Sequence, residues 1–313
     1  MTSAVAAEGL RKRYGGGTTA LDGFDLHAPA GGVYGLLGPN GAGKTTAVRA
    51  LATLLTFDAG RAEVAGADVR RQPEVVRDRI ALTGQYAAVD EILSGRQNLV
   101  LFGRLQHLGA RDAQRRADEL LEQFGLTEAK GRSAAEYSGG MRRRLDLAAS
   151  MIRRPAVLFL DEPTTGLDPR SRNQVWDAVR ALVAGGTTVL LTTQYLDEAD
   201  QLAARIAVVD AGRVVAEGTP AQLKATIGAD RLELVVEDAA RLADAATVVA
   251  GLTGTTPDVD ADQRRLRVPV TDRVGSLVAT VRALQDAGIP VADAGLHRPT
   301  LDEVFLHLTG AAR

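Results

Sequence analysis

The sequence contains no cysteine, and this absence excludes disulfide bonds, thiolate metal sites and cysteine nucleophiles together. It has no basic excess either, because 37 lysines and arginines stand against 39 acidic residues and leave a formal net charge of −2. A dedicated nucleic-acid-binding protein should show a basic excess or patch, so no nucleic-acid partner is expected. Lysine is scarce, since all but four of the basic residues are arginine. The four are Lys12, Lys44, Lys130 and Lys224.

Long apolar runs are also missing. No stretch approaches the roughly 18 uninterrupted apolar residues that a membrane-spanning helix needs. Residues 1–16 hold no apolar core of signal-peptide length, so we expect a cytoplasmic protein. The remaining composition is ordinary for a globular protein, with 45% hydrophobic and 24% charged residues. At roughly 150 residues per domain, the 313 residues suggest about two domains.

Alternating strand and helix patterns in the first part of the chain predict an α/β core with a mainly parallel sheet. Residues 33–37 and 156–160 are short, continuous apolar runs, which are typical of strands buried on both faces. Residues 96–125 show the pattern of amphipathic helices with arginines on their polar faces. A helix over 171–184 and an apolar strand over 187–193 follow.

The pattern changes near residue 229, which predicts a first domain over 1–228 and an accessory α+β domain over 229–313. The elements expected there are a strand at 231–237, a helix at 239–251, a hairpin through 255–270, a helix at 273–287, a strand at 289–296 and a helix at 300–309. The order β-α-β-β-α-β with a closing helix resembles a small ferredoxin-like fold. One face of the closing helix is apolar, which favours packing within this domain, with contact to a partner as the alternative.

A complete phosphate-loop motif, G-x-x-x-x-G-K-[ST], lies between the first apolar strand and a helix. The motif and the threonine after it comprise Gly38, Pro39, Asn40, Gly41, Ala42, Gly43, Lys44, Thr45 and Thr46. Glycines let backbone N–H groups surround phosphate oxygens, and the helix N-terminus adds its positive dipole end. Lys44 is expected to reach the β- and γ-phosphates, and the Thr45 hydroxyl to ligate Mg²⁺. The motif predicts a nucleotide hydrolase and leaves its class open.

Two acids end the apolar run at 156–160. We expect Asp161 to hold Mg²⁺ through water and Glu162 to polarise the attacking water. A surface strand that merely ends in two acids is the alternative, and the sequence PTTGLDP that follows at once argues against it.

At this point the sequence resembles the ATP-binding subunit of an ABC transporter. Residues 137–148, YSGGMRRRLDLA, are similar to the LSGGQ signature of that family. Residues 161–169, DEPTTGLDP, match the family's Walker B and D-loop motifs. Gln85 stands where the family has its Q-loop glutamine, and Tyr14 where it has the aromatic residue that stacks on adenine. The resemblance covers roughly residues 5–225.

This resemblance implies a P-loop NTPase core with a mixed sheet and a helical subdomain over about 86–155. It implies ATP and Mg²⁺ as ligands, with Gln85 joining Thr45 and Asp161 at the metal. It also implies a head-to-tail dimer of two copies, in which the signature of one copy contacts the γ-phosphate bound to the other. The residues of this second half-site are Ser138, Gly139, Gly140 and, in the D-loop, Asp168.

GQYAAVDEILSGRQNL and HRPTLDEVFLHLTG are similar to a narrower group, the daunorubicin/doxorubicin-resistance type of drug-export ATPase. That likeness implies a peripheral subunit at the cytoplasmic face of the membrane, which powers a separate permease for efflux of a hydrophobic drug or antibiotic. Two other functions stay open, a non-transport ABC-type ATPase acting on nucleic acid or ribosomes and a regulatory nucleotide-binding module.

The sequence departs from the family pattern at two notable positions. Met141 replaces the signature glutamine, which backbone N–H groups and Ser138 should tolerate. Gln194 stands where most members have a histidine that contacts the γ-phosphate, and glutamine cannot become a cation. We therefore expect retained ATP turnover with Glu162 as the principal base and Gln194 as a catalytic contact.

A cluster of arginines at 142–144, 153 and 154 could suggest nucleic acid. Nearby acids and the overall charge favour a solvated helix face instead.

Overall fold

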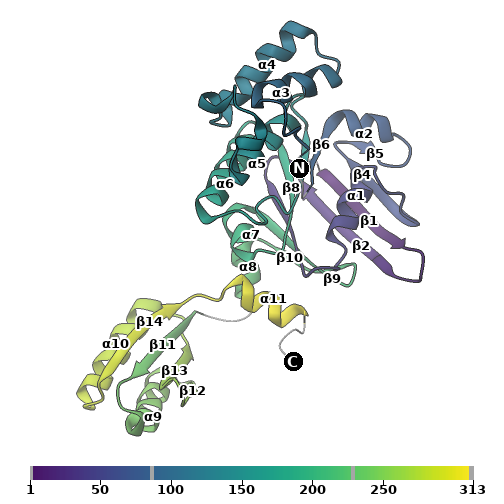
Figure 1. Cartoon of the computed structure of the whole chain (residues 1–313). Helices are drawn as coiled ribbons and strands as arrows, with labels where there is room; N and C mark the ends of the chain where they lie inside the picture. Colours follow the sequence, from purple (N-terminus) through teal and green to yellow (C-terminus); the bar gives the residue numbers. More distant parts are fainter. Residues whose placement is uncertain (1–2, 85–87, 227–229, 310–313) are drawn as a thin grey trace. The chain divides into compact units, whose positions relative to one another are not determined.

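The computed structural model describes residues 3–84, 88–226 and 230–309, and the chain divides into two compact units, 1–220 and 221–313 (Figure 1). The domain boundary predicted at 228 and 229 lies outside the described residues. None of the helices in these ranges is long and apolar enough to cross a membrane.

The first unit contains two sheets. One is antiparallel with the order β2-β1-β4-β5. Its strands are β1 (Ser3–Arg13), β2 (Thr19–Pro29), β4 (Ala59–Val64) and β5 (Ala67–Asp68). The other has six strands in the order β10-β9-β3-β8-β7-β6, all parallel except β10. These are β3 (Val33–Leu37), β6 (Ile80–Thr83), β7 (Val157–Asp161), β8 (Thr188–Thr193), β9 (Arg205–Asp210) and β10 (Arg213–Gly218).

The central strands form because their sequences are apolar throughout. Every residue of β3, β7 and β8 is buried, as continuous apolar runs predict for parallel strands covered on both faces. Helix α1 (Lys44–Leu51) contacts β2 and β4 of the first sheet and β7 of the second, so its apolar side joins both sheets in one core. The mixed α/β core expected from the sequence is confirmed.

The remaining helices of this unit are α2 (Pro73–Arg79), α3 (Gly95–Leu105), α4 (Ala110–Gln123), α5 (Gly139–Ser150), α6 (Pro169–Ala184) and α7 (Leu196–Leu202), with 3-10 turns at Thr127–Ala129 and Ala134–Glu136. Helix α3 packs on α4 and α5 at the top of Figure 1. Helix α4 is amphipathic, since Ala113, Ala117, Leu120 and Leu121 are buried while Arg111 and Arg115 are exposed.

A short helix, α8 (Pro220–Ala225), begins with proline, which is favoured at the first position of a helix. The second unit then runs in the predicted order β-α-β-β-α-β. Its antiparallel sheet has the order β12-β13-β11-β14. The elements are β11 (Arg231–Val236), a 3-10 turn (Ala239–Arg241), α9 (Leu242–Thr253), β12 (Asp258–Asp260), β13 (Arg265–Pro269), α10 (Arg273–Asp286), β14 (Val291–His297) and α11 (Leu301–Thr309).

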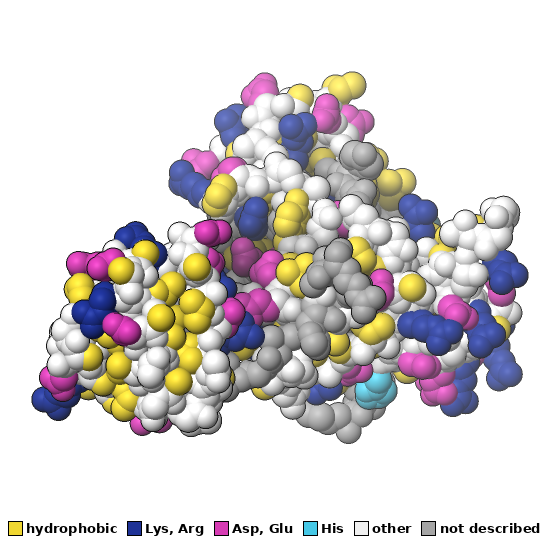
Figure 2. Space-filling model, turned by 90° about the horizontal axis from the view of Figure 1, so that it is seen from below, with side chains coloured by type: hydrophobic (Ala, Val, Ile, Leu, Met, Phe, Trp, Pro, Cys, Tyr) yellow, Lys and Arg dark blue, Asp and Glu magenta, His cyan; other side chains and the backbone are white. Residues whose placement is uncertain are grey.

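The core of the second unit comes from alternating strand residues and one side of each helix. Leu232 and Leu234 of β11 point inward with Val249 of α9 and Leu284 of α10. The surface is apolar in places, and hydrophobic side chains gather on this unit at the left of Figure 2. The exposed large hydrophobic residues in this unit include Leu252, Val259, Val274 and Val278.

Candidate nucleotide site

The phosphate loop connects the end of β3 to the start of α1, at the carboxyl edge of the parallel sheet where α/β proteins bind ligands. Two of its glycines are required by packing. Gly43 has φ +105°, and a Cβ there would collide with the carbonyl oxygen of Ala20. A Cβ on Gly38 would collide with the carbonyl oxygen of Val209. The loop can therefore keep this shape only without side chains at these positions.

Lys44 is only 5% exposed, and its Nζ donates hydrogen bonds to the carbonyl oxygens of Gly38 (2.7 Å) and Pro39 (3.0 Å). Burial lowers the pKa of Lys44, while the carboxylates of Glu162 and Asp161 act in the opposite direction. The ammonium group lies inside the loop that the motif predicts to surround phosphates. Asn40 and Gly41, at the tip of the same loop, are exposed.

Asp161 ends β7 beside the first turn of α1. The Thr45 hydroxyl donates to Asp161 Oδ1 at 3.3 Å, and the Thr192 hydroxyl from the end of β8 donates to the same oxygen. A hydroxyl and a carboxylate are hard oxygen donors of the kind that Mg²⁺ binds, so these residues fit the expected metal. Sequence reasoning missed Thr192, although its place near the end of a buried strand next to β7 could have indicated it.

Glu162 has a strained backbone with φ 49°, a conformation that costs a non-glycine residue about 1–2 kcal/mol. Its N–H donates to the carbonyl oxygen of Thr192 at 3.0 Å, and its Oε2 accepts from the Thr165 hydroxyl at 3.3 Å. The side chain is 8% exposed. Because such strain persists only where neighbours enforce it, Glu162 has the marks of a functional residue.

The signature residues begin α5. Ser138 caps this helix, with its Oγ accepting from the N–H of Met141 at 3.2 Å. Gly140 packs so closely on Ser171 that a Cβ would lie 2.6 Å from it. Asp168 caps α6 by accepting from the N–H (3.0 Å) and hydroxyl (2.5 Å) of Ser171, and these bonds lower the pKa of Asp168. Signature and D-loop thus meet at Ser171.

A hollow of about 370 Å³ lies between these groups. It brings together Gly139 of the signature, Arg142 and Arg143 of α5, and Glu162 and Thr165 after β7. The predicted carboxylate and the predicted signature therefore line one space within a single chain.

Three further residues were predicted for the site, and two of them, Tyr14 and Gln194, lie within the described residues. The Tyr14 ring is 39% exposed, with its hydroxyl 3.5 Å from Thr46 Oγ1 and the Lys12 ammonium 5.9 Å from its centroid. Gln194 follows β8 directly and is half-buried. Gln85 lies outside the described residues.

The expectation that the arginine cluster forms a solvated helix face is wrong for Arg143, and Arg144 is half-buried. Arg143 is 6% exposed and bonds to two backbone carbonyls, whereas Arg153 and Arg154 are exposed. Helix periodicity could have suggested this, because Arg143 lies three residues before Asp146 on the same side of α5. Glu198 was also missed; its buried Oε1 accepts from Thr164 (2.8 Å) and Trp176 (3.1 Å).

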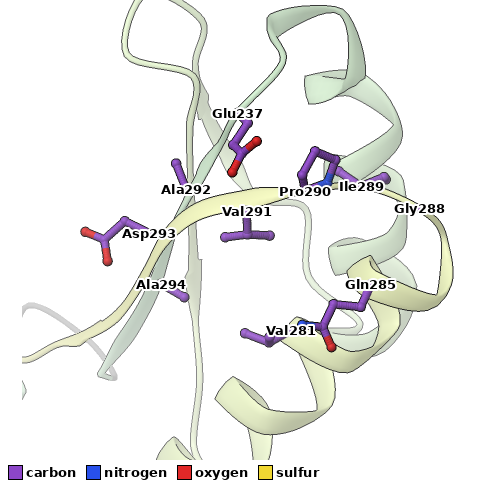
Figure 3. A pocket seen from close by; sticks show the side chains of 10 residues that line it. All are labelled: Glu237, Val281, Gln285, Gly288, Ile289, Pro290, Val291, Ala292, Asp293 and Ala294. Atoms are coloured by element: carbon purple, nitrogen blue, oxygen red, sulfur yellow. The ribbon is translucent and has the colours of Figure 1, made fainter.

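A separate hollow of about 650 Å³ lies in the second unit, between the end of α10 and β14 (Figure 3). Its lining combines the apolar Val281, Ile289 and Val291 with the polar Glu237 and Gln285, while the Asp293 side chain points away (Figure 3). It contains none of the residues predicted to bind nucleotide.

Comparisons with known proteins agree with the geometry. A family model described as ABC transporter matches residues 21–165. Daunorubicin resistance ATP-binding protein DrrA2 of Streptomyces coeruleorubidus is 64% identical over 98% of this chain and 95% of its own length. Daunorubicin/doxorubicin resistance ATP-binding protein DrrA of Streptomyces peucetius is 55% identical, with 99% and 93% covered.

More distant similarity extends to other exporters and to solved structures. Nod factor export ATP-binding protein I of Ralstonia nicotianae is 39% identical over 99% of this chain and 94% of that protein. The structure of cbiO1 from Clostridium perfringens, part of the ABC transporter complex cbiONQ, superimposes with a TM-score of 0.67 at 25% identity. It covers 72% of this chain and 94% of that one.

Proposed function

The chain belongs to the family of ABC transporter ATP-binding proteins, and from this premise we propose that it powers efflux of a hydrophobic drug or antibiotic through a separate membrane permease. The family membership makes it an ATPase coupled to transport. The names of its relatives support a drug as the cargo, since two that are 64% and 55% identical to this chain carry daunorubicin resistance in their names.

One observation carries the catalytic part of the proposal. The buried Lys44 ammonium, the Thr45–Asp161 pair and Glu162 converge at the carboxyl edge of one sheet. Lys44 would bind the β- and γ-phosphates, and Tyr14 would stack on adenine. Thr45, Asp161 and Gln85 would hold Mg²⁺, which neutralises charge that develops on the phosphates.

Glu162 would orient the attacking water and take its proton as the bond to the γ-phosphate forms. Gln194 would contact the γ-phosphate from the adjacent strand end, donating one N–H without carrying charge. Ser138, Gly139, Gly140 and Asp168 of one copy would complete the site of a second copy, so that ATP joins the two. Because the permease lies in the membrane, the proposed location of this subunit is the cytoplasmic face of the membrane, bound to the permease.

Glu162→Gln tests the catalytic assignment. The variant keeps the size of the side chain and removes the base, so MgATP turnover by the purified chain should fall about 100-fold or more while ATP still binds. Turnover and nucleotide binding are measured on the same preparation. Turnover within threefold of the wild type would show that another group is the base.

Efflux is tested in cells that express the chain together with a candidate ABC permease. Cells should retain less of a fluorescent hydrophobic drug than cells in which the chain carries Lys44→Ala. The chain should sediment with membranes only when the permease is present. Equal drug retention in both strains would contradict the export function and leave the ATPase function standing.

A further inference from the structure

Helix α5 carries two charged residues that are almost fully buried, Arg143 (6% exposed) and Asp146 (5% exposed). Their Nη1 and Oδ2 atoms lie 3.3 Å apart. Burial lowers the pKa of Arg143 and raises that of Asp146, which shows the desolvation that both charges suffer. Charges are buried at such a cost only when specific partners hold them.

The partners of Arg143 come from two other segments of the nucleotide site. Its Nε donates to the carbonyl oxygen of Pro163 at 2.8 Å, and its Nη1 donates to that of Gly84 at 2.6 Å. Pro163 is the residue directly after Glu162, and Gly84 directly follows β6. One guanidinium group thus joins the signature helix to the backbone beside the proposed base.

Asp146 continues this connection one turn along α5. Its Oδ1 accepts a hydrogen bond from the N–H of Ala88 at 2.8 Å. Gly84 and Ala88, which flank residues 85–87, are therefore held by the two members of one ion pair on one helix. The link also reaches the hollow described above, since Arg143 and Glu162 both line it.

Stability alone does not account for this pair. Replacing a buried ion pair by apolar residues of similar volume is often neutral or stabilising. Nη2 of Arg143 is buried and has no hydrogen-bond partner among the described residues, which adds a further cost. What the guanidinium provides is its fixed fork of donors, which can bond two carbonyl groups from different segments at once.

We infer that Arg143 and Asp146 are a positioning pair, which holds the backbone at Glu162 in register with the signature helix so that the carboxylate is correctly placed for water attack. This inference rests on the proposed ATPase mechanism. It assigns neither residue a contact with nucleotide, so the pair acts on turnover through Glu162 and leaves ATP affinity unchanged.

The test compares two double variants of the full chain. Arg143→Met with Asp146→Leu removes both charges and keeps similar volume. We expect it to fold with a thermal midpoint near that of the wild type, to bind ATP within threefold of the wild-type Kd, and to lose at least tenfold in kcat. The matched control is Arg96→Met with Asp118→Leu, which removes the pair between α3 and α4 (2.7 and 2.8 Å) and should leave kcat within twofold.

Arg143→Lys provides a second readout that does not require loss of charge. A lysine cannot bond Pro163 and Gly84 with the planar fork, so kcat should fall while KM for ATP stays within threefold. A double variant that folds and keeps kcat within twofold would overturn the positioning role. If the double variant fails to fold, a wild-type kcat in Arg143→Lys overturns it equally. A wild-type chain without turnover would instead contradict the proposed function and the role that depends on it.

Discussion

Lys44, Asp161 and Glu162 are each less than a tenth exposed in the first unit, whereas the buried positions of the second unit, within the described ranges, are apolar apart from Thr280. The second unit keeps its charges at or near the surface, for example Glu233 between Arg265 (2.8 Å) and Arg267 (3.1 Å). Burying a charge costs free energy unless partners compensate it.

The difference indicates how the two units divide their tasks. The first contains buried charges that are held by specific partners, and several of them, including Lys44 and Asp161, lie at the proposed nucleotide site. The second is built for packing alone in its interior, which fits an accessory role. Substitutions can test this contrast, since those of residues at the proposed nucleotide site in the first unit should change turnover, whereas those in the core of the second unit should change only stability.

Lys44→Ala should have the largest effect. Removing the ammonium from the phosphate loop should lower ATP turnover about 1,000-fold or more, because no other described lysine lies in the loop to replace it. The fold should persist, since Lys44 bonds to two carbonyls of its own loop and not to a neighbouring strand. An ATPase assay measures turnover and circular dichroism measures retention of the fold. Substantial turnover in a folded variant would contradict the assignment of Lys44 to phosphate binding.

Leu234→Ala should affect the second unit alone. Leu234 is fully buried in the core of that unit, so truncation should cost about 2–5 kcal/mol of its unfolding free energy. ATP affinity should stay within twofold of the wild type. Denaturant unfolding and nucleotide titration on the same sample provide the measurements. Val274→Ala, at a position 68% exposed, is the matched control and should change stability by less than about 0.5 kcal/mol. Loss of ATP binding in Leu234→Ala would show that the second unit contributes to the nucleotide site and does not only pack its own core.

Tyr14→Ala tests the edge of the nucleotide site. If the ring stacks on adenine, its loss should weaken ATP binding by about 1–3 kcal/mol, which is roughly 5- to 150-fold. Tyr14→Phe keeps the ring and removes only the hydroxyl near Thr46, so it should bind within threefold of the wild type. Equal affinity of the alanine and phenylalanine variants would exclude stacking.

Gln194→His should have the smallest effect. Histidine is the common residue of the family there and can also donate to the γ-phosphate, so turnover should be retained or rise by a few-fold. Gln194→Leu, which cannot donate, serves as the control and should be slower than either. A large loss of turnover in the histidine variant would count against a simple contact with the γ-phosphate.

Local patterns were sufficient for much of this molecule. The apolar runs of β3 and β7, the glycines before Lys44 and the element order of the second unit could all be predicted, because each depends on neighbours in sequence. The antiparallel sheet around β1 was not predicted. Its first pair, β1 with β2, joins neighbouring strands, whereas the pairing of β1 with β4 joins segments that are far apart in the chain.

Sequence alone was enough to predict the candidate site, because the phosphate loop and the acids at the end of β7 are contiguous motifs whose spacing restricts their geometry. Which other residues join them depends on the tertiary structure. Thr192 reaches Asp161 from a neighbouring strand, and Arg143 bonds to the residues beside Glu162 and β6. Such contacts depend on how distant segments pack. The identity of a helical arginine does not reveal whether its side chain lies in solvent or donates to a buried carbonyl group.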